Sequence, residues 1–311
     1  MSSILDELTR EVWPRIDRGD RARLHVLGHD RAKFLHNLTT NEVKRLAVGR
    51  GVEAFVTSPQ GKTLAWVTIH ALEDRLLVGA DPGGLDMALP HLRKYGMFDD
   101  VELEEVSART FEHHIFGQFA EALFLEGWNE DELSVVSTAL KGLPVVLIRE
   151  SPMGVAGVTI VGDIADEPAV LAALLGPAIV PELAEALRIR AGTPRFGVDL
   201  GPDNLPQEAA RDGRAISFTK GCYLGQETVA RLDALGHVNK VLRRLRIDCG
   251  PIPSAGTPLE VDGKPAGAIT SSAEIGGESW AIGMVRAKVA EAGRVLGFDT
   301  GRSATVESPH R

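Results

Sequence analysis

The order of its regular elements is what most constrains the fold of this chain. Runs of β-forming residues predict strands over 23–27, 52–57, 64–69, 76–79 and 101–103. Helical periodicity predicts one helix that Asp30 caps and a second over 85–95. Ser58 to Lys62, which contains Pro59 and Gly61, predicts a hairpin between the second and third strands. The order strand, helix, three strands, helix, strand indicates an antiparallel sheet covered by helices, which is an α+β design.

The second half of the chain weakly repeats this order before its texture changes. Strands are expected over 111–116, 145–149 and 155–161, and helices over 168–175 and 181–191. A further amphipathic helix is expected over 4–16. After Asn239, short alternating runs separated by glycine and proline predict a small β-barrel or sandwich. We therefore expect two α+β subdomains, at about 20–106 and 107–240 within a region 1–240, and a C-terminal barrel at 241–311.

Composition excludes several classes of protein. A net charge of −9 and a pI near 5.5 argue against non-specific binding to nucleic acid. No apolar run is long enough to span a bilayer, and no secretory signal is apparent. Cys222 and Cys249 are too few for a disulfide framework and lack the spacing of a zinc site, so no metal site is expected. Cys249 reads as packing at a strand end. These features predict a cytoplasmic protein.

The stretch Lys220-Gly221-Cys222-Tyr223-Leu224-Gly225-Gln226-Glu227-Thr228 carries the strongest chemical signal. Ala215 to Phe218 is strand-like, and helical periodicity begins near Leu224, which places Cys222 close to a helix N-terminus. The helix dipole and the neighbouring ammonium group of Lys220 would favour a reactive thiolate. A small residue packed in a tight turn explains the same cysteine equally well. The residues alone leave both interpretations open.

This stretch resembles the K-G-C-[FY]-x-G-Q-E signature of the YgfZ family, which are folate-binding proteins related to the aminomethyltransferase (T-protein) of the glycine cleavage system. Three other blocks of that superfamily have counterparts here in the same order, at 34–43, 91–101 and 188–208. The chain is thereby identified as a member of this superfamily. The resemblance implies a ring-like fold in which two antiparallel-sheet α+β subdomains form the folate-binding region and a small β-barrel closes it.

The resemblance also implies a site. Glu208 matches the position of the carboxylate that binds the pterin, and a cation near the cleft would meet the carboxylates of the folate tail. The expected reactive thiol is Cys222, assisted by Lys220. The residues expected to bind tetrahydrofolate, or a one-carbon derivative of it, are Glu208, Asn41, Arg195, Tyr223, Gln226, Glu227 and Arg231.

One departure from the family pattern bears on function. Aminomethyltransferases carry acidic residues just after the hairpin glycines, where this chain has Ala65 and Trp66, and neither side chain can polarise an amine. This counts against a conventional aminomethyltransferase and leaves open whether the chain is an enzyme.

We expect a tetrahydrofolate-binding factor that supports assembly or repair of iron–sulphur clusters, and thereby tRNA thiomethylation, with Cys222 facing the folate. The expected partners are folate and iron–sulphur proteins or cluster-assembly factors, without direct binding to nucleic acid or membrane. One alternative is a folate-dependent aminomethyltransferase or demethylase. The other is a non-catalytic folate-binding scaffold in which Cys222 is structural.

Overall fold

The structure is a computed structural model that describes residues 14–117, 128–129, 131–173, 176–236, 238–248, 250–299 and 301–308. Most of the helix expected over 4–16 lies outside these residues, as does Cys249. The part of that helix that is described is instead a strand, β1 (Arg15–Asp17). None of the helices in the described ranges is long and apolar enough to cross a bilayer.

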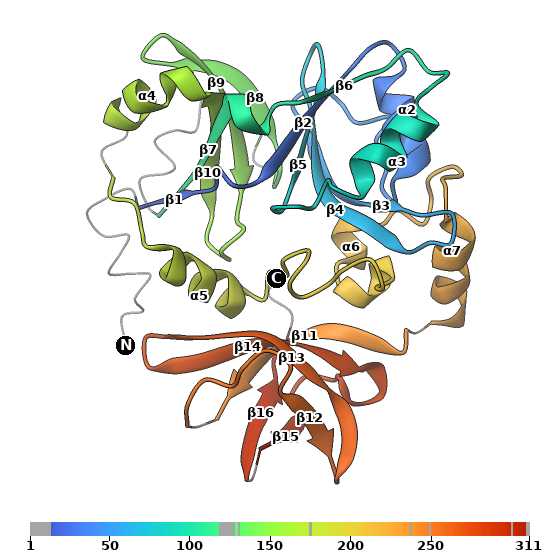
Figure 1. Cartoon of the computed structure of the whole chain (residues 1–311), viewed down its shortest axis with the longest axis vertical. Helices are drawn as coiled ribbons and strands as arrows, with labels where there is room; N and C mark the ends of the chain where they lie inside the picture. Colours follow the sequence, from blue (N-terminus) through green and yellow to red (C-terminus); the bar gives the residue numbers. More distant parts are fainter. Residues whose placement is uncertain are drawn as a thin grey trace.

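The first sheet confirms the predicted order of elements (Figure 1). Its strands lie in the order β3-β4-β5-β2-β6, and each pairs antiparallel with its neighbours. Phe34, Leu35 and Leu92 pack the helices onto the sheet. Asp30 differs from its expected role, because its carboxylate accepts from the Asp100 amide at 3.1 Å instead of capping the helix. The elements are β2 (Ala22–Leu27), α2 (Arg31–Leu38), β3 (Gly51–Thr57), β4 (Thr63–Ala71), β5 (Leu76–Ala80), α3 (Ala88–Tyr95) and β6 (Glu102–Glu105).

The second sheet repeats the topology of the first. Its order, β8-β9-β10-β7-β1, matches β3-β4-β5-β2-β6 strand for strand, but its last strand comes from the N-terminal side of the chain. The elements are β7 (Thr110–Phe116), β8 (Val135–Leu140), β9 (Leu143–Glu150), β10 (Gly157–Asp163) and α4 (Glu167–Ala173), with short 3-10 turns at Ser107–Arg109 and Ile164–Asp166. The weak internal repeat expected from the sequence is therefore a repeat of topology.

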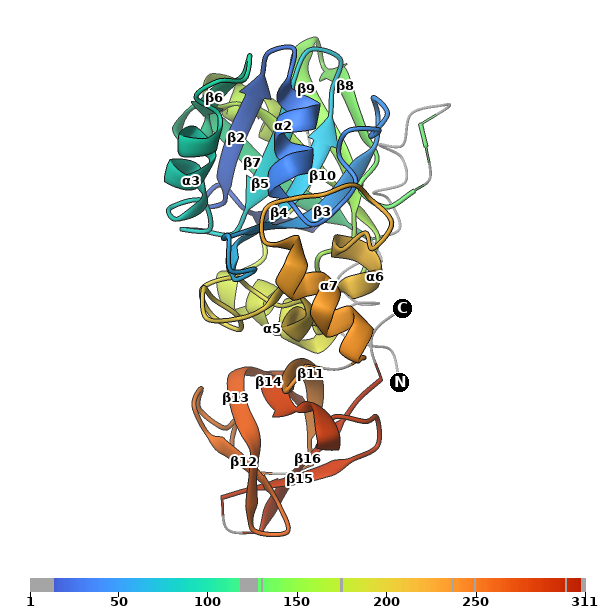
Figure 2. The same ribbon diagram turned by 90° about the vertical axis from the view of Figure 1, so that its right-hand side faces the viewer.

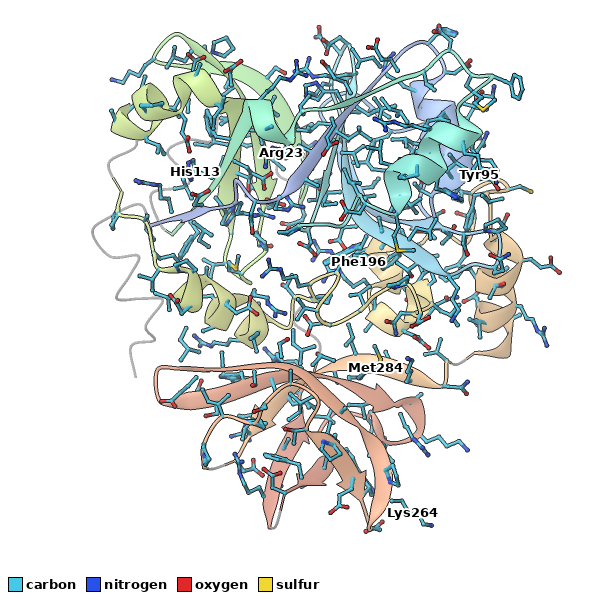
Figure 3. The ribbon with its side chains drawn as sticks, in the orientation of Figure 1. Arg23, Tyr95, His113, Phe196, Lys264 and Met284 are labelled. Carbon is cyan, nitrogen blue, oxygen red and sulfur yellow. The ribbon has the colours of Figure 1, made fainter. Side chains whose placement is uncertain are left out.

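A cluster of buried charges joins the two sheets. Glu112 on β7 accepts from Arg21 at 2.8 Å and lies 3.3 Å from Arg18 and 3.4 Å from Arg23. Arg23, which is labelled on β2 in Figure 3, also donates to the carbonyls of Ser107 and Thr110 at 2.9 Å. Burial alone would raise the pKa of Glu112, but the guanidinium groups of Arg21 and Arg18 outweigh it and the pKa is lowered. Glu112 is therefore ionised at neutral pH and binds the β1–β2 segment to the second sheet.

His114, next to this cluster, predicts a loss of stability in acid. Burial lowers the pKa of His114 from 6.5 to about 4, with the charge of Glu150 opposing the shift. The unfolded chain takes up a proton near pH 6.5 while the folded chain does not, so stability falls as the pH drops from 6.5 to 4, by about 3 kcal/mol. His70 shifts in the same direction, and burial of Asp212, whose pKa rises to about 6, acts oppositely. Denaturant titrations at several pH values should show a flatter acid dependence for His114→Gln; an identical dependence would contradict this assignment.

The remaining elements connect the two sheets to the barrel (Figure 2). Helix α5 (Pro181–Ala191) has the predicted bounds, with Pro181 at its start and Gly192 at φ +75° after its end. It is followed by the 3-10 turn η4 (Pro206–Ala209), α6 (Asp212–Ala215) and α7 (Gln226–Leu235). The strand expected over Ala215–Phe218 is wrong, because α6 occupies Ala215 and the following residues are irregular.

The C-terminal barrel is closed, in the order β11-β14-β13-β12-β15-β16. Leu187 and Ile189 of α5 pack with Trp280 and Ile282 of the barrel, so the barrel and the ring share one apolar cluster. Strand β15 was not anticipated from the sequence. The strands are β11 (Lys240–Ile247), β12 (Pro258–Val261), β13 (Lys264–Ile275), β14 (Glu278–Arg286), β15 (Val295–Phe298) and β16 (Arg302–Val306), with a 3-10 turn at Ala287–Val289.

Candidate functional site

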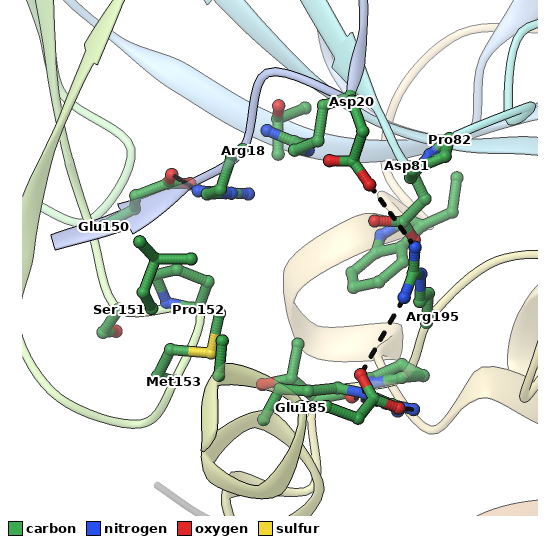
Figure 4. A pocket seen from close by; sticks show the side chains of 18 of the residues that line it. Arg18, Asp20, Asp81, Pro82, Glu150, Ser151, Pro152, Met153, Glu185 and Arg195 are labelled. Atoms are coloured by element: carbon green, nitrogen blue, oxygen red, sulfur yellow. Dashed lines mark hydrogen bonds and ion pairs between the residues drawn. The ribbon is translucent and has the colours of Figure 1, made fainter. Parts of the chain in front are cut away.

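A cavity of about 490 Å³ lies where the two sheets meet α5 and α6. Figure 4 shows Glu150, Ser151, Pro152 and Met153 along one wall and Asp20, Asp81 and Arg195 along the other. Its volume is within the range of sites that take a ligand of drug size. Most of its charged side chains come in opposed pairs. The charged residues lining it are Asp17, Arg18, Asp20, Arg21, Glu53, Asp81, Glu132, Glu150, Glu182, Glu185, Arg188, Arg195, Arg211 and Arg214.

One wall combines an aromatic ring with a paired carboxylate. Glu53 is buried, accepts from Arg211 Nε at 2.6 Å, and forms an ion pair with Arg214 Nε at 2.9 Å. The Arg211 guanidinium lies 5.0 Å from the centroid of the Trp66 ring, and Trp66 is paired with Phe55 across the sheet. Trp66 Nε1 is buried and has no hydrogen-bond partner among the described residues. This wall therefore has a saturated carboxylate and an unsatisfied indole donor.

Asp81 supplies a carboxylate beside that indole. Val67 pairs with Ala80, so the register places Asp81 opposite Trp66 at the end of β5. Asp81 Oδ2 accepts from the amide of Phe196 at 2.7 Å, which fixes the orientation of the carboxylate. Oδ1 has no hydrogen bond to any described residue. Asp81 can therefore accept a hydrogen bond, or hold a cation, from a molecule in the cavity.

Arg195 stands at the mouth of the cavity with loosely held charge. Its side chain is 37% exposed and lies 3.7 Å from Asp20 and 3.9 Å from Glu185, as the dashed lines in Figure 4 mark. Ion pairs of this length and exposure contribute little. A ligand carboxylate could therefore replace either ion pair at a small cost in free energy.

Arg195 alone among the predicted site residues, all of which are described, lines this cavity. Glu208 is buried elsewhere: it accepts from Asn204 Nδ2 at 2.7 Å, in the turn η4, and lies 3.8 Å from Lys240 of the barrel. Asn41 donates to the carbonyls of Glu53 and Arg214 at 2.8 Å each. The polar atoms of both side chains serve the protein's own backbone and side chains in the structure. Their roles in ligand binding stay predictions.

Lys220 holds the C-terminal end of α2 and the residues that follow it through hydrogen bonds. Lys220 Nζ donates to the carbonyls of His36, Thr39 and Asn41 at 2.5, 2.6 and 2.8 Å, instead of facing the thiol as expected. Burial lowers the pKa of Lys220 to about 7, with Glu42 opposing the shift.

The other predicted residues in and after the motif lie close to Lys220 or on the exposed side of α7. Tyr223 is buried, with the Lys220 ammonium 4.8 Å from its ring centroid, and burial raises its pKa to about 12. Gln226 Oε1 accepts from the Tyr223 amide at 3.3 Å. Glu227 and Arg231 are exposed on α7.

The glycines of the motif have a packing role. Gly225 precedes α7 at φ +83°, and a Cβ there would lie 2.3 Å from the carbonyl oxygen of Ser58 in the β3–β4 hairpin. Gly61 in that hairpin has φ +75°, and its Cβ would lie 2.7 Å from Thr228. Only glycine allows both the backbone conformation and the close approach. The motif thus holds the start of α7 against the hairpin.

Cys222 is exposed and lies outside the central cavity. It lines a shallow groove of about 450 Å³ on the outer surface together with Asn37, Tyr95 and Asp99. It precedes the first residue of α7 by a short irregular segment, so it is outside the first helical turn. The structure therefore differs from the expectation that this thiol faces the ring centre. In the described ranges, no group of three or more His, Cys, Asp or Glu side chains could hold a metal ion.

Comparisons with known proteins show which proteins the chain resembles in sequence. No protein-family model matches the chain. It is 25% identical to the tRNA-modifying protein YgfZ of Colwellia psychrerythraea, over 73% of this chain and 69% of that protein. It is 27% identical to the mitochondrial iron-sulfur cluster assembly factor IBA57 homolog of Mycosarcoma maydis, over 84% of this chain and 64% of that protein.

A solved structure shows the fold. The glycine cleavage system aminomethyltransferase T of Bartonella henselae superposes with a TM-score of 0.85 at 19% identity, covering 98% of this chain and 88% of that one. The chain is thus similar in sequence to YgfZ-type proteins, and it has the fold of a glycine cleavage T-protein.

The cavity of this chain has side chains that fit a reduced folate. A pterin presents a guanidine-like edge of donors and a carbonyl acceptor, and folate ends in carboxylates. Asp81 Oδ1 can accept from the donor edge. Trp66 Nε1 and Arg21 Nε are buried donors without a partner among the described residues, and both residues line the cavity. Arg195 offers a cation for a carboxylate. The donor and acceptor types present thus match both ends of the molecule.

Sequence reasoning missed Asp81, Glu53, Arg188 and Asp199. The family blocks contained a usable signal for two of them. The family block at 188–208 begins with the pattern R-x-x-x-G-x-P-x-x-G-x-D. Arg188 and Asp199 are the first and last residues of this pattern, and they form a buried ion pair at 2.5 Å. Paired charges at the two ends of such a pattern indicate a contact between them.

The position of Cys222 gives a direct prediction. Because the thiol lies outside the central cavity, saturating tetrahydrofolate should leave its rate of alkylation by iodoacetamide unchanged. The rate is measured by mass spectrometry in a Cys249→Ser background, so that only Cys222 reacts. Strong protection by the ligand would instead place the thiol at the folate.

Proposed function

We propose that this YgfZ-type chain binds tetrahydrofolate, or a one-carbon derivative of it, in the central cavity and in that state supports iron–sulphur cluster assembly or repair. Two of its relatives are named as a tRNA-modifying protein and as an iron-sulfur cluster assembly factor. The observation that carries the proposal is the cavity itself. One of its walls carries the indole N–H of Trp66, which has no hydrogen-bond partner among the described residues, and the carboxylate of Asp81, which is hydrogen-bonded through Oδ2. When bound, the folate supplies a carrier for a one-carbon group.

The residues of the chain divide the binding between them. Asp81 accepts from the pterin edge, because its carboxylate is fixed through Oδ2 and keeps Oδ1 available. Trp66 contributes apolar ring area and its N–H. Arg195 meets the tail carboxylates at the mouth, where charge-assisted hydrogen bonds replace its long ion pairs.

We propose a separate place for the thiol. Cys222 is exposed in the outer groove. A chemical species that reacts with its thiol would therefore be delivered by a partner protein that binds at that surface. Cys222→Ala protein should then bind tetrahydrofolate normally and fail to restore the activity of a cluster-dependent enzyme in a deletion strain. Full restoration by this variant would remove the thiol from the function.

A cavity-filling variant tests the proposal in cells. Ala184 on α5 lines the cavity, and Ala184→Trp would place an indole where the ligand lies. In a deletion strain, tRNA thiomethylation should be restored by wild type and by Ala230→Trp, which adds the same ring on the exposed face of α7, but not by Ala184→Trp. Equal restoration by both variants would show that the cavity is dispensable.

One observation favours a second function, folate-dependent aminomethyl transfer. Ala65 and Trp66 lack the expected carboxylates, yet Asp81 brings a carboxylate to the same wall from the neighbouring strand. That carboxylate could hold the amine of an aminomethyl donor, which passes its methylene group to tetrahydrofolate and releases ammonia. Formation of methylenetetrahydrofolate from such a donor, lost in Asp81→Asn, would establish this activity, and its absence with wild type would exclude it.

A further inference from the structure

The segment that carries Arg195 is held by two carboxylates that bind consecutive backbone amides. The amide of Arg195 donates to Asp199 Oδ2 at 2.9 Å, and the amide of Phe196 donates to Asp81 Oδ2 at 2.7 Å. Gly197 at φ +85° then turns the chain, and its amide donates to the Leu200 carbonyl at 2.7 Å. The backbone at Arg195 is therefore fixed from both sides, although the guanidinium itself is loosely held.

Asp199 is in turn held by the barrel. Its Oδ1 accepts from Thr270 Oγ1 at 2.5 Å and from the hydroxyl of Ser271, both on β13. Its Oδ2 also accepts from Arg188 of α5 at 2.5 Å. Asp199 is buried, so these contacts are shielded from water. Figure 3 shows Phe196 in this segment, between the sheets and the barrel.

Every acceptor site of Asp199 is thus used to connect three units: α5, the Arg195 segment and β13. The hydrogen bond from Thr270 to Oδ1 favours the orientation of the carboxylate in which Oδ2 accepts from the Arg195 amide. Loss of the barrel hydroxyls would release this orientation. The guanidinium would then sample positions away from the mouth.

We propose that Asp199, together with Thr270 and Ser271 of the barrel, positions Arg195 to bind the carboxylate tail of the ligand. This inference rests on the proposed folate site and deepens it: the barrel contributes to the preference for tail-bearing reduced folates over reduced pterins that lack the glutamate. Asp199, Thr270 and Ser271 are positioning residues, because they act through Arg195 and do not line the cavity themselves.

The test compares two ligands, tetrahydrofolate and tetrahydropteroate, which lacks the glutamate. Wild type should bind tetrahydrofolate at least about tenfold more tightly than tetrahydropteroate, because one charge-assisted hydrogen bond contributes about that factor. Arg195→Ala should abolish this preference and leave tetrahydropteroate binding unchanged. Thr270→Val keeps the shape of the side chain and removes the hydroxyl, so it should reduce the preference several-fold. Asp199→Asn should reduce the preference further. If Asp199→Asn does not fold, the result for Thr270→Val decides the test.

Thr257→Val is the matched control, because Thr257 is a barrel threonine whose hydroxyl bonds to the Ser254 carbonyl. It should leave the preference unchanged. An unchanged preference in Thr270→Val, or an equal loss of affinity for both ligands, would overturn the positioning role while leaving the folate site intact. Failure of wild type to bind either ligand would overturn the folate site itself.

Discussion

Glu112→Gln should lower the free energy of unfolding by about 3–5 kcal/mol, the usual cost of leaving a buried charge without its partner. Glu112 is 2% exposed and faces Arg18, Arg21 and Arg23, all within 3.4 Å. Glutamine keeps the size of the side chain but removes the negative charge and places an N–H₂ group against guanidinium groups. Glu150 remains beside Arg18 and compensates only part of the positive charge.

Glu307→Gln is the control that separates the effect of burial from the effect of losing an ion pair. Glu307 pairs with Arg246 at 3.0 Å on the barrel, where Arg246 is half exposed. Exposed pairs contribute about 0–1 kcal/mol, so this variant should unfold close to wild type in urea. Similar stabilities for both variants would show that the cluster joining the two sheets is not a stabilising interaction.

Lys220→Met should destabilise the chain by about 2–3 kcal/mol near pH 9, because buried carbonyls lose their donor. The loss should be smaller at pH 6, where removal of an ammonium group whose pKa is lowered to about 7 recovers its desolvation cost. Methionine fills the same volume but leaves the carbonyls of His36, Thr39 and Asn41 without this donor.

Lys94→Met provides the control for that change. Lys94 lies 5.5 Å from the Tyr95 ring centroid, as Lys220 lies over Tyr223, but it is exposed on α3. Lys94→Met should therefore have little effect on the free energy of unfolding in urea. A loss as large as that of Lys220→Met would assign the effect to the cation–π contact and not to the carbonyls.

The sequence predicted elements whose signal is local. Helix α5 had proline at its start and glycine after its end, and the β3–β4 hairpin had turn residues at the turn itself. Strand β8 was missed because it lies at a sheet edge and only Val135 of its residues is buried, which leaves a weak apolar pattern. Strand β1 was missed because its partner, β7, is distant in the sequence.

The site could not be assembled from local signals. Trp66, Asp81 and Arg195 come from β4, the end of β5 and the segment after α5, and only the folded ring brings them together. Family blocks marked stretches of the sequence but not the direction of their side chains. Glu208 and Lys220 lie in such stretches, yet their polar atoms bond to the protein itself.

Calorimetric titration with tetrahydrofolate tests the central claim most directly, with Ala184→Trp compared against wild type and Ala230→Trp. If the central cavity is the folate site, wild type and Ala230→Trp release heat that saturates at a single site per chain, and Ala184→Trp releases none. Heat of binding that is unchanged in Ala184→Trp, or no binding of any reduced folate by wild type, would contradict it.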